Sequence, residues 1–193
     1  MLHHVLIVFG SSYGHTATIA AGMQRALAED GITASIVDAA HRPHAIDPSS
    51  FDGVIVGASV IGGKHNRAVE AFIKRHRETL TRLPSAFYSV SGSAASADPR
   101  RRSDARLLME RFLTKLHWDP DLLTTFGGAI VFTRYSFLLR WVMKQIARRN
   151  GEPTDTSRDH DLTNWNHVEE FAHRFAHLVA PTTLVASHAV GIS

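Results

Sequence analysis

Five consecutive apolar residues, VLIVF at positions 5–9, stand near the start of the chain. Neighbouring side chains of a strand point to opposite faces of its sheet, so an unbroken apolar run indicates a strand buried on both faces. In α/β proteins such strands lie side by side in a parallel sheet that helices cover on both faces. The run therefore predicts a central strand of an α/β domain.

Strand-like and helix-like segments alternate along the rest of the chain. The predicted strands cover residues 5–9, 32–37, 54–56, 86–90 and 128–132, and the predicted helices cover residues 16–28, 69–80, 104–116 and 164–179. We expect Leu107 and Leu178 to lie on the buried sides of the last two helices. The alternation predicts one doubly wound α/β domain over residues 1–180, with residues 181–193 as a tail.

The absence of cysteine from all 193 residues excludes disulfides, a thiol nucleophile and cysteine-ligated metal centres. Any redox chemistry therefore needs an organic cofactor. The first apolar run is too short to span a bilayer, and no basic leader precedes it, so we expect a cytoplasmic protein. His173 and His177 have the spacing of two metal ligands, but no Glu follows His173 as a zincin requires, so we expect solvent-facing histidines and no metal.

The charge balance is mildly basic, with 21 Lys and Arg residues against 18 Asp and Glu residues and a pI near 9.6. A basic surface favours anionic ligands or anionic lipids. The chain has no zinc-finger spacing, no recognition-helix pattern and no basic stripe interleaved with aromatic residues. We therefore expect no nucleic-acid partner.

The segment GSSYGHT at residues 10–16 joins the first strand directly to the first helix. Backbone N–H groups and the positive end of the helix dipole make such a junction a phosphate-binding site. The segment is neither a Walker loop nor a dinucleotide fingerprint. It closely resembles the FMN phosphate loop of flavodoxins, although His15 stands where a small polar residue is frequent. The resemblance implies that FMN binds here, and the candidate contacts are Ser11, Ser12, Tyr13, Gly14, His15 and Thr16.

A flavodoxin-like sheet has five parallel strands in the order 2-1-3-4-5 and binds its cofactor beyond the carboxyl ends of the strands. The segments after the third and fourth strands, residues 58–65 and 91–98, are rich in glycine or serine. The candidate flavin contacts in them are Ala58, Ser59, Val60, Ile61, Gly62, Gly63, Ser91, Gly92 and Ser93. Amides near Gly62 and Gly63 would stabilise reduced flavin, or these glycines would simply form a tight turn.

Two departures from a carrier flavodoxin favour an enzyme: the chain is not acidic, and neither segment contains Trp or Tyr to cover the flavin ring. Seven further segments resemble the quinone-dependent protoporphyrinogen dehydrogenase family. They are GAS (57–59), FIKRH (72–76), PSAF (84–87), FGGAIVFTRY (126–135), RWVMK (140–144), TDTS (154–157) and NW (164–165). The resemblance covers residues 4–179. Residues 91–98 resemble the family less than their flanks do.

This resemblance implies oxidation of protoporphyrinogen IX, a tetrapyrrole, to protoporphyrin IX, with electrons passing through FMN to menaquinone or ubiquinone. The chemistry then belongs to the cofactor, so no residue is assigned as catalytic. Two alternatives stay open. They are an NAD(P)H:quinone reductase with the same fold, and an electron-carrier flavodoxin that is not an enzyme.

A long insertion, residues 133–163, separates the fifth predicted strand from the last helix. A helix over residues 136–149 would carry an apolar stripe with Trp141 beside it and a basic stripe opposite. That pattern suits peripheral contact with an anionic membrane, or packing on the domain or on a second subunit of a homo-oligomer. The candidate substrate or membrane contacts are Arg100, Arg101, Arg134, Arg140, Lys144 and Arg148.

Overall fold

A five-stranded parallel sheet forms the centre of the fold. The computed structural model describes residues 2–41, 47–130 and 155–181, together with Trp141, Gln145 and Arg148. The parallel strands are β1 (His4–Gly10), β2 (Thr33–Asp38), β3 (Gly53–Ile61), β5 (Ser85–Ser91) and β6 (Leu122–Gly127). Their order is β2-β1-β3-β5-β6, which confirms the predicted order 2-1-3-4-5. A short strand, β4 (Lys64–His65), adds to β3 in the antiparallel sense.

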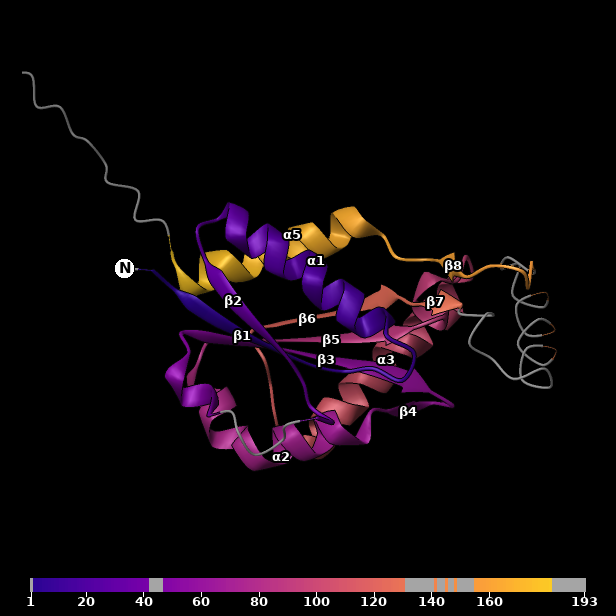
Figure 1. The fold of residues 1–193 in the computed structure, drawn as a ribbon. Helices are drawn as coiled ribbons and strands as arrows, with labels where there is room; N and C mark the ends of the chain where they lie inside the picture. Colours follow the sequence, from indigo (N-terminus) through magenta and orange to yellow (C-terminus); the bar gives the residue numbers. More distant parts are fainter. Residues whose placement is uncertain are drawn as a thin grey trace, which may run out of the picture.

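Helices cover both faces of this sheet (Figure 1). One face packs against α1 (His15–Glu29) and α5 (Trp165–Val179), and the other packs against α2 (Arg67–Arg82) and α3 (Pro99–Leu116). Alternate side chains of β1 divide between the two layers. Val5 and Ile7 join the core beneath α1 and α5, and Leu6 and Val8 join the core beneath α2 and α3. All four side chains are buried, as the unbroken apolar run predicted.

The fifth parallel strand lies at residues 122–127, so the prediction that residues 128–132 form this strand was wrong. The strand β6 is an edge strand, and residues 122–125 are only half-buried, which is why its sequence LLTTFG lacks a continuous apolar run. Beyond Gly128, β7 (Ala129–Ile130) pairs with β8 (His160–Asp161) as a separate antiparallel ribbon. The connection from the sheet to α5 therefore begins at residue 128.

Two helices differ from the predicted pattern. The helix α3 begins at Pro99 instead of residue 104, because the Asp98 side chain accepts a hydrogen bond from the Arg100 N–H at 2.9 Å and caps the helix. Leu107 and Leu178 are 43% and 41% exposed, so their predicted burial was wrong. The buried face of α5 continues to Val179, and that of α3 passes through Ala105.

Part of the insertion and most of the tail lie outside the described residues. This applies to Arg134, Arg140 and Lys144, and to residues 182–193. In the predicted helix over 136–149, Trp141, Gln145 and Arg148 are described, and all three are helical. Among the helices that the structure describes, none has the length and apolarity that crossing a membrane requires.

Candidate functional site

The loop between β1 and α1 has the geometry of a phosphate seat. Gly14 is the N-cap of α1, with φ 92°, and no side chain caps the first turn of the helix. The first N–H groups of a helix have no carbonyl partner within it, so they are available to a ligand. The Gly14 N–H donates to Ser11 Oγ at 2.8 Å, which folds the loop, and Thr16 is 1% exposed. Ser12 is exposed, while Tyr13 and His15 are half-buried.

Side chains outside this loop pack closely against its two ends. The Tyr88 ring fills the space beside Gly57, where an added Cβ would lie 2.0 Å from the ring. The Tyr88 hydroxyl donates to the Thr16 carbonyl at 3.3 Å, which ties the first turn of α1 to β5. The Asn66 side chain lies so close to Gly10 that a Cβ there would approach it to 2.6 Å. The packing therefore requires glycine both at Gly10, the last residue of β1, and at Gly57, in the middle of β3.

The segment after the third strand is a hairpin, not the open loop predicted over residues 58–65. The strand β3 continues to Ile61, and Gly62 and Gly63 form the two-residue turn to β4 with φ values of 56° and 72°. Both values suit glycine in a two-residue hairpin. Ala58 is fully buried in the core, so its side chain does not face a ligand. Val60 is half-buried and Ile61 is 47% exposed.

One buried hydroxyl at this edge has no hydrogen-bond partner among the described residues. Ser59 Oγ is buried and makes no hydrogen bond with any described group. A buried polar group without a partner costs roughly 1–3 kcal/mol, so such a group at a strand end suits a ligand with polar atoms. Ser59, the uncapped helix N-terminus and the glycine turn lie at the carboxyl ends of neighbouring strands. These features fit a flavin nucleotide.

The segment after β5 is short and internally bonded. Ser91 is buried, and its Oγ accepts a hydrogen bond from the Ala94 N–H at 3.2 Å. Gly92 is exposed, and Ser93 begins a single 3₁₀ turn, residues Ser93–Ala95. Arg102 Nη1 donates to the Ser96 and Ala97 carbonyls at 2.7 and 2.9 Å, so this arginine holds the segment in place.

The arginines after this segment form the first turn of α3, not a free loop. Arg100 is exposed, and Arg101 is half-buried. Arg100 therefore remains accessible to a substrate.

His65 is the last residue of the hairpin strand β4 and pairs with Val60 of β3. The ring is 7% exposed, stacks on Phe112 with centroids 4.2 Å apart, and has Nε2 3.0 Å from Ser89 Oγ. Burial lowers the pKa of His65 to about 4, and nearby Glu70 only partly opposes this. His65 is therefore neutral at pH 7 and brings no positive charge to this edge.

Two contacts of the loop were not predicted from the sequence. His15 Nε2 lies 2.6 Å from Thr163 Oγ1 and 3.3 Å from Asp161 Oδ1. A pocket lies between the phosphate loop and the β7–β8 ribbon, and its lining residues are Tyr13, Gly14, His15, Thr18, Ala129, Asp159 and Asp161. His15 and Thr163 are 148 positions apart in the sequence, and no local sequence pattern predicts such a contact.

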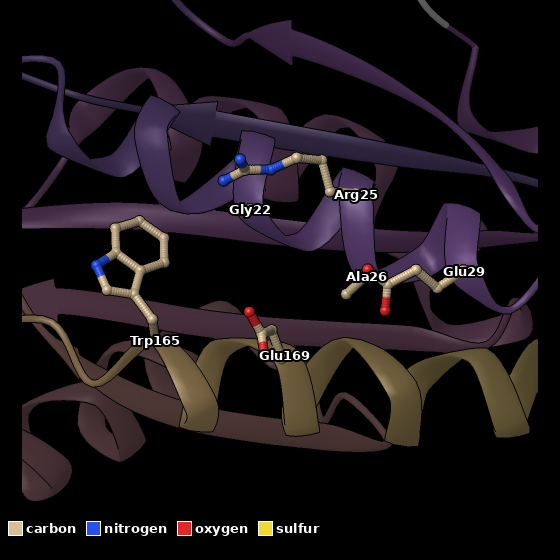
Figure 2. Close-up of a pocket in the computed structure, with 6 residues that line it drawn as sticks. All are labelled: Gly22, Arg25, Ala26, Glu29, Trp165 and Glu169. Atoms are coloured by element: carbon tan, nitrogen blue, oxygen red, sulfur yellow. The ribbon is translucent and has the colours of Figure 1, made fainter.

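A second pocket lies between α1 and α5 (Figure 2). Arg25 and Glu29 project from later turns of α1, and Trp165 and Glu169 project from α5. None of these four residues belongs to the three segments that end the parallel strands. This pocket is therefore separate from the candidate cofactor site.

Comparison with known proteins gives the family. The family model of the flavodoxin domain matches residues 6–157. The protoporphyrinogen IX dehydrogenase (quinone) of Escherichia coli strain K12 is 34% identical over 179 residues, which cover 93% of this chain and 98% of that protein. The protein of the same name from Leishmania major is 30% identical over 174 residues, which cover 90% of this chain and 74% of that protein.

Solved structures agree on the fold. Oxidised flavodoxin 1 from Bacillus cereus has a TM-score of 0.54 at 17% identity, covering 89% of this chain and 96% of that one. A flavodoxin variant from Pseudomonas aeruginosa has a TM-score of 0.52 at 16% identity, covering 91% of this chain and 98% of that one.

These findings confirm the predicted flavodoxin-like fold and the predicted cofactor, FMN. The near-complete coverage of the bacterial dehydrogenase goes further than the fold, because it includes the region between β6 and α5. The chain belongs to the flavodoxin-domain family and, within it, to the family of the quinone-dependent protoporphyrinogen IX dehydrogenases.

Proposed function

We propose that this chain oxidises protoporphyrinogen IX to protoporphyrin IX and delivers the electrons to a membrane quinone. The observation that carries the proposal is the 34% identity to the E. coli dehydrogenase over almost the whole of both chains. The site agrees with it. The residues of the β3–β4 hairpin and of segment 91–98 include no Trp or Tyr to cover a flavin ring. An uncovered ring leaves room for a planar substrate.

Bound FMN would supply the electron transfer, accepting electrons from the tetrapyrrole and donating them to the quinone. The chain's own residues bind and orient it. The loop with Ser11, Gly14 and Thr16 would hold the phosphate through N–H groups and hydroxyls. Ser59 and the Gly62–Gly63 turn would meet one edge of the ring, and the backbone of residues 91–93 would meet another.

The proposal is tested by anaerobic turnover of the FMN-loaded chain with protoporphyrinogen IX and a menaquinone analogue. We expect porphyrin fluorescence to appear only when both protein and quinone are present. Fluorescence at the rate of the protein-free control would refute the proposal. Quinone-dependent oxidation of NADPH, without oxidation of protoporphyrinogen IX, would support the alternative of an NAD(P)H:quinone reductase. A stable one-electron intermediate in a reductive titration, without turnover of protoporphyrinogen IX, would support the alternative of an electron-carrier flavodoxin.

We also propose that Arg100 attracts a propionate of the tetrapyrrole. Arg100 is exposed at the start of α3, directly after the segment that ends β5. Guanidinium groups pair well with carboxylates. Arg100→Glu should raise KM for protoporphyrinogen about tenfold with a smaller change in kcat, as expected when a charge-assisted contact of about 1.5 kcal/mol is lost. Arg111→Glu, an exposed site later in the same helix, serves as the control. Equal KM values for both variants would remove Arg100 from substrate binding.

Peripheral contact with an anionic membrane is a further part of the proposal. Trp141 is 59% exposed and Arg148 is exposed, and both are helical. An exposed tryptophan near basic residues suits a lipid–water interface. Replacing Arg140, Lys144 and Arg148 by glutamate should abolish co-sedimentation with vesicles that contain anionic lipid. Unchanged co-sedimentation would contradict membrane contact through these residues and would favour packing on the domain or on a second subunit.

A further inference from the structure

The ring of His15, in the phosphate loop, is held from outside that loop. Its Nε2 faces Thr163 Oγ1 at 2.6 Å and Asp161 Oδ1 at 3.3 Å, and the His15 and Trp165 rings are in a T-shaped arrangement with centroids 6.4 Å apart. The His15 side chain is 14% exposed. The residues that hold it all precede or begin α5.

These partners are themselves fixed. Thr163 Oγ1 donates to the Gly127 carbonyl at 2.9 Å, and Trp165 Nε1 donates to Asp161 Oδ2 at 3.0 Å. The Trp165 indole packs on Gly22 of α1, where a Cβ would lie 2.9 Å from its Cζ3, and Figure 2 shows the ring facing that helix. The groups that contact His15 are therefore each held by a further contact within the fold.

The hydrogen bonds assign the tautomer of His15. Since the Thr163 hydroxyl donates to the Gly127 carbonyl, we assign Thr163 Oγ1 as the acceptor of a hydrogen bond from His15 Nε2. The Asp161 carboxylate is also an acceptor. Nε2 therefore carries the proton of the neutral ring, and Nδ1 is the nitrogen at which a second proton would be added.

One carboxylate faces this ring directly, because Asp161 Oδ1 lies 3.3 Å from His15 Nε2. Asp161 also lines the pocket beside the ring, together with Tyr13 of the loop and Asp159. A phosphate monoester adds a charge of about −1.5 to −2 at pH 7. Burial lowers the pKa of His15, and Asp161 opposes this effect, so the ring is neutral at pH 7 before the phosphate binds. An incoming anion then favours the imidazolium.

We propose that binding of the FMN phosphate is coupled to the uptake of one proton by His15 at Nδ1, with Asp161 as the counterion that holds the imidazolium. The proton comes from solvent, and no bond to the cofactor changes. The proposal rests on the phosphate seat proposed above. His15 is then a positioning residue that supplies a positive charge when the phosphate is present.

Proton uptake on binding makes the affinity for FMN depend on pH. A complex that binds more protons than its free components becomes more stable as pH falls, by at most tenfold in affinity per pH unit. The affinity for FMN relative to riboflavin, which lacks the phosphate, should therefore rise several-fold from pH 8 to pH 6.5. Below about pH 6 the phosphate takes up its own proton, which sets the lower limit of the window.

Calorimetric titration of the flavin-free full chain at pH 7, in two buffers of different ionisation enthalpy, measures the proton directly. We expect net proton uptake with FMN and none with riboflavin. His15→Gln keeps a donor for Thr163 but cannot titrate, so it should lose the uptake, and Asp161→Asn should reduce it. His173→Gln is the matched control, because His173 also pairs with an aspartate, Asp30 at 2.7 Å, but lies far along α5. The His173→Gln variant should take up as many protons on FMN binding as the wild type does.

FMN binding without proton uptake in the wild type would overturn the proposal and leave the phosphate seat intact. Equal uptake in His15→Gln would do the same. Equal affinity for FMN and riboflavin would remove the phosphate seat and the proposal with it. The wild-type titration needs no variant, so the test stands even where a substitution disturbs folding.

Discussion

His65 provides a quantitative link between the hairpin and the stability of the fold. Its ring is 7% exposed between Phe112 and Ser89, and its pKa is about 4, compared with 6.5 for an ordinary histidine. The unfolded chain therefore binds a proton that the folded chain rejects between these values. The stabilising effect is complete above pH 6.5 and is lost as pH falls toward 4. The pKa difference corresponds to about 3 kcal/mol, with a slope approaching 1.4 kcal/mol per pH unit.

Urea unfolding of the wild type and of His65→Gln at pH 4.5, 5.5 and 7 measures this effect. Gln retains a hydrogen-bonding group near Ser89 but does not titrate. The stability advantage of the wild type over the variant should shrink by about 2–3 kcal/mol between pH 7 and pH 4.5. Taking the difference removes the contribution of the carboxylates, which both proteins share. Hydrogen bonding to Asp30 raises the pKa of His173, so His173→Gln should show a pH dependence of opposite sign. Parallel curves for the wild type and His65→Gln would refute the assignment of a buried neutral His65.

Two further pairs of substitutions test the packing at Gly57 and the N-cap of α3. Gly57→Ala places a Cβ 2.0 Å from the Tyr88 ring and should cost at least 2–3 kcal/mol in thermal unfolding, whereas Gly92→Ala, with nothing within 4 Å of the added Cβ, should change stability by less than about 0.5 kcal/mol. Asp98→Ala removes the N-cap of α3 and should cost about 1 kcal/mol, while Asp104→Ala, at an exposed position in the same helix, should cost nothing measurable. Equal losses within either pair would contradict the assigned role.

The central strands could be predicted because the relevant physics is local, whereas their order was predicted from the resemblance to flavodoxins. A strand buried on both faces must be apolar throughout, and Val5 and Leu6, which face opposite layers, show this directly. The edge strand β6 was missed for the same reason. Thr124 and Thr125 are half-buried, so its sequence has no continuous apolar run, whereas the sequence GAIVF at residues 128–132 is more apolar and has the stronger strand pattern.

The start of α3 was present in the sequence, because Asp98 and Pro99 form a cap and a first helical residue. The hairpin turn was also present in Gly62 and Gly63, and β3 was predicted to end too early. The contact of His15 with Asp161 and Thr163 could not be predicted. It joins two segments through tertiary packing, and neither segment carries a periodic pattern that refers to the other.

The central claim is that the loop containing Ser11, Gly14 and Thr16 seats the phosphate of FMN. Equilibrium binding of FMN and of riboflavin to the flavin-free full chain, measured by quenching of flavin fluorescence, tests it most directly. We predict that FMN binds at least 100-fold more tightly than riboflavin, and that Ser11→Ala reduces the affinity for FMN roughly tenfold while leaving that for riboflavin nearly unchanged. Equal affinities for the two flavins would contradict the account.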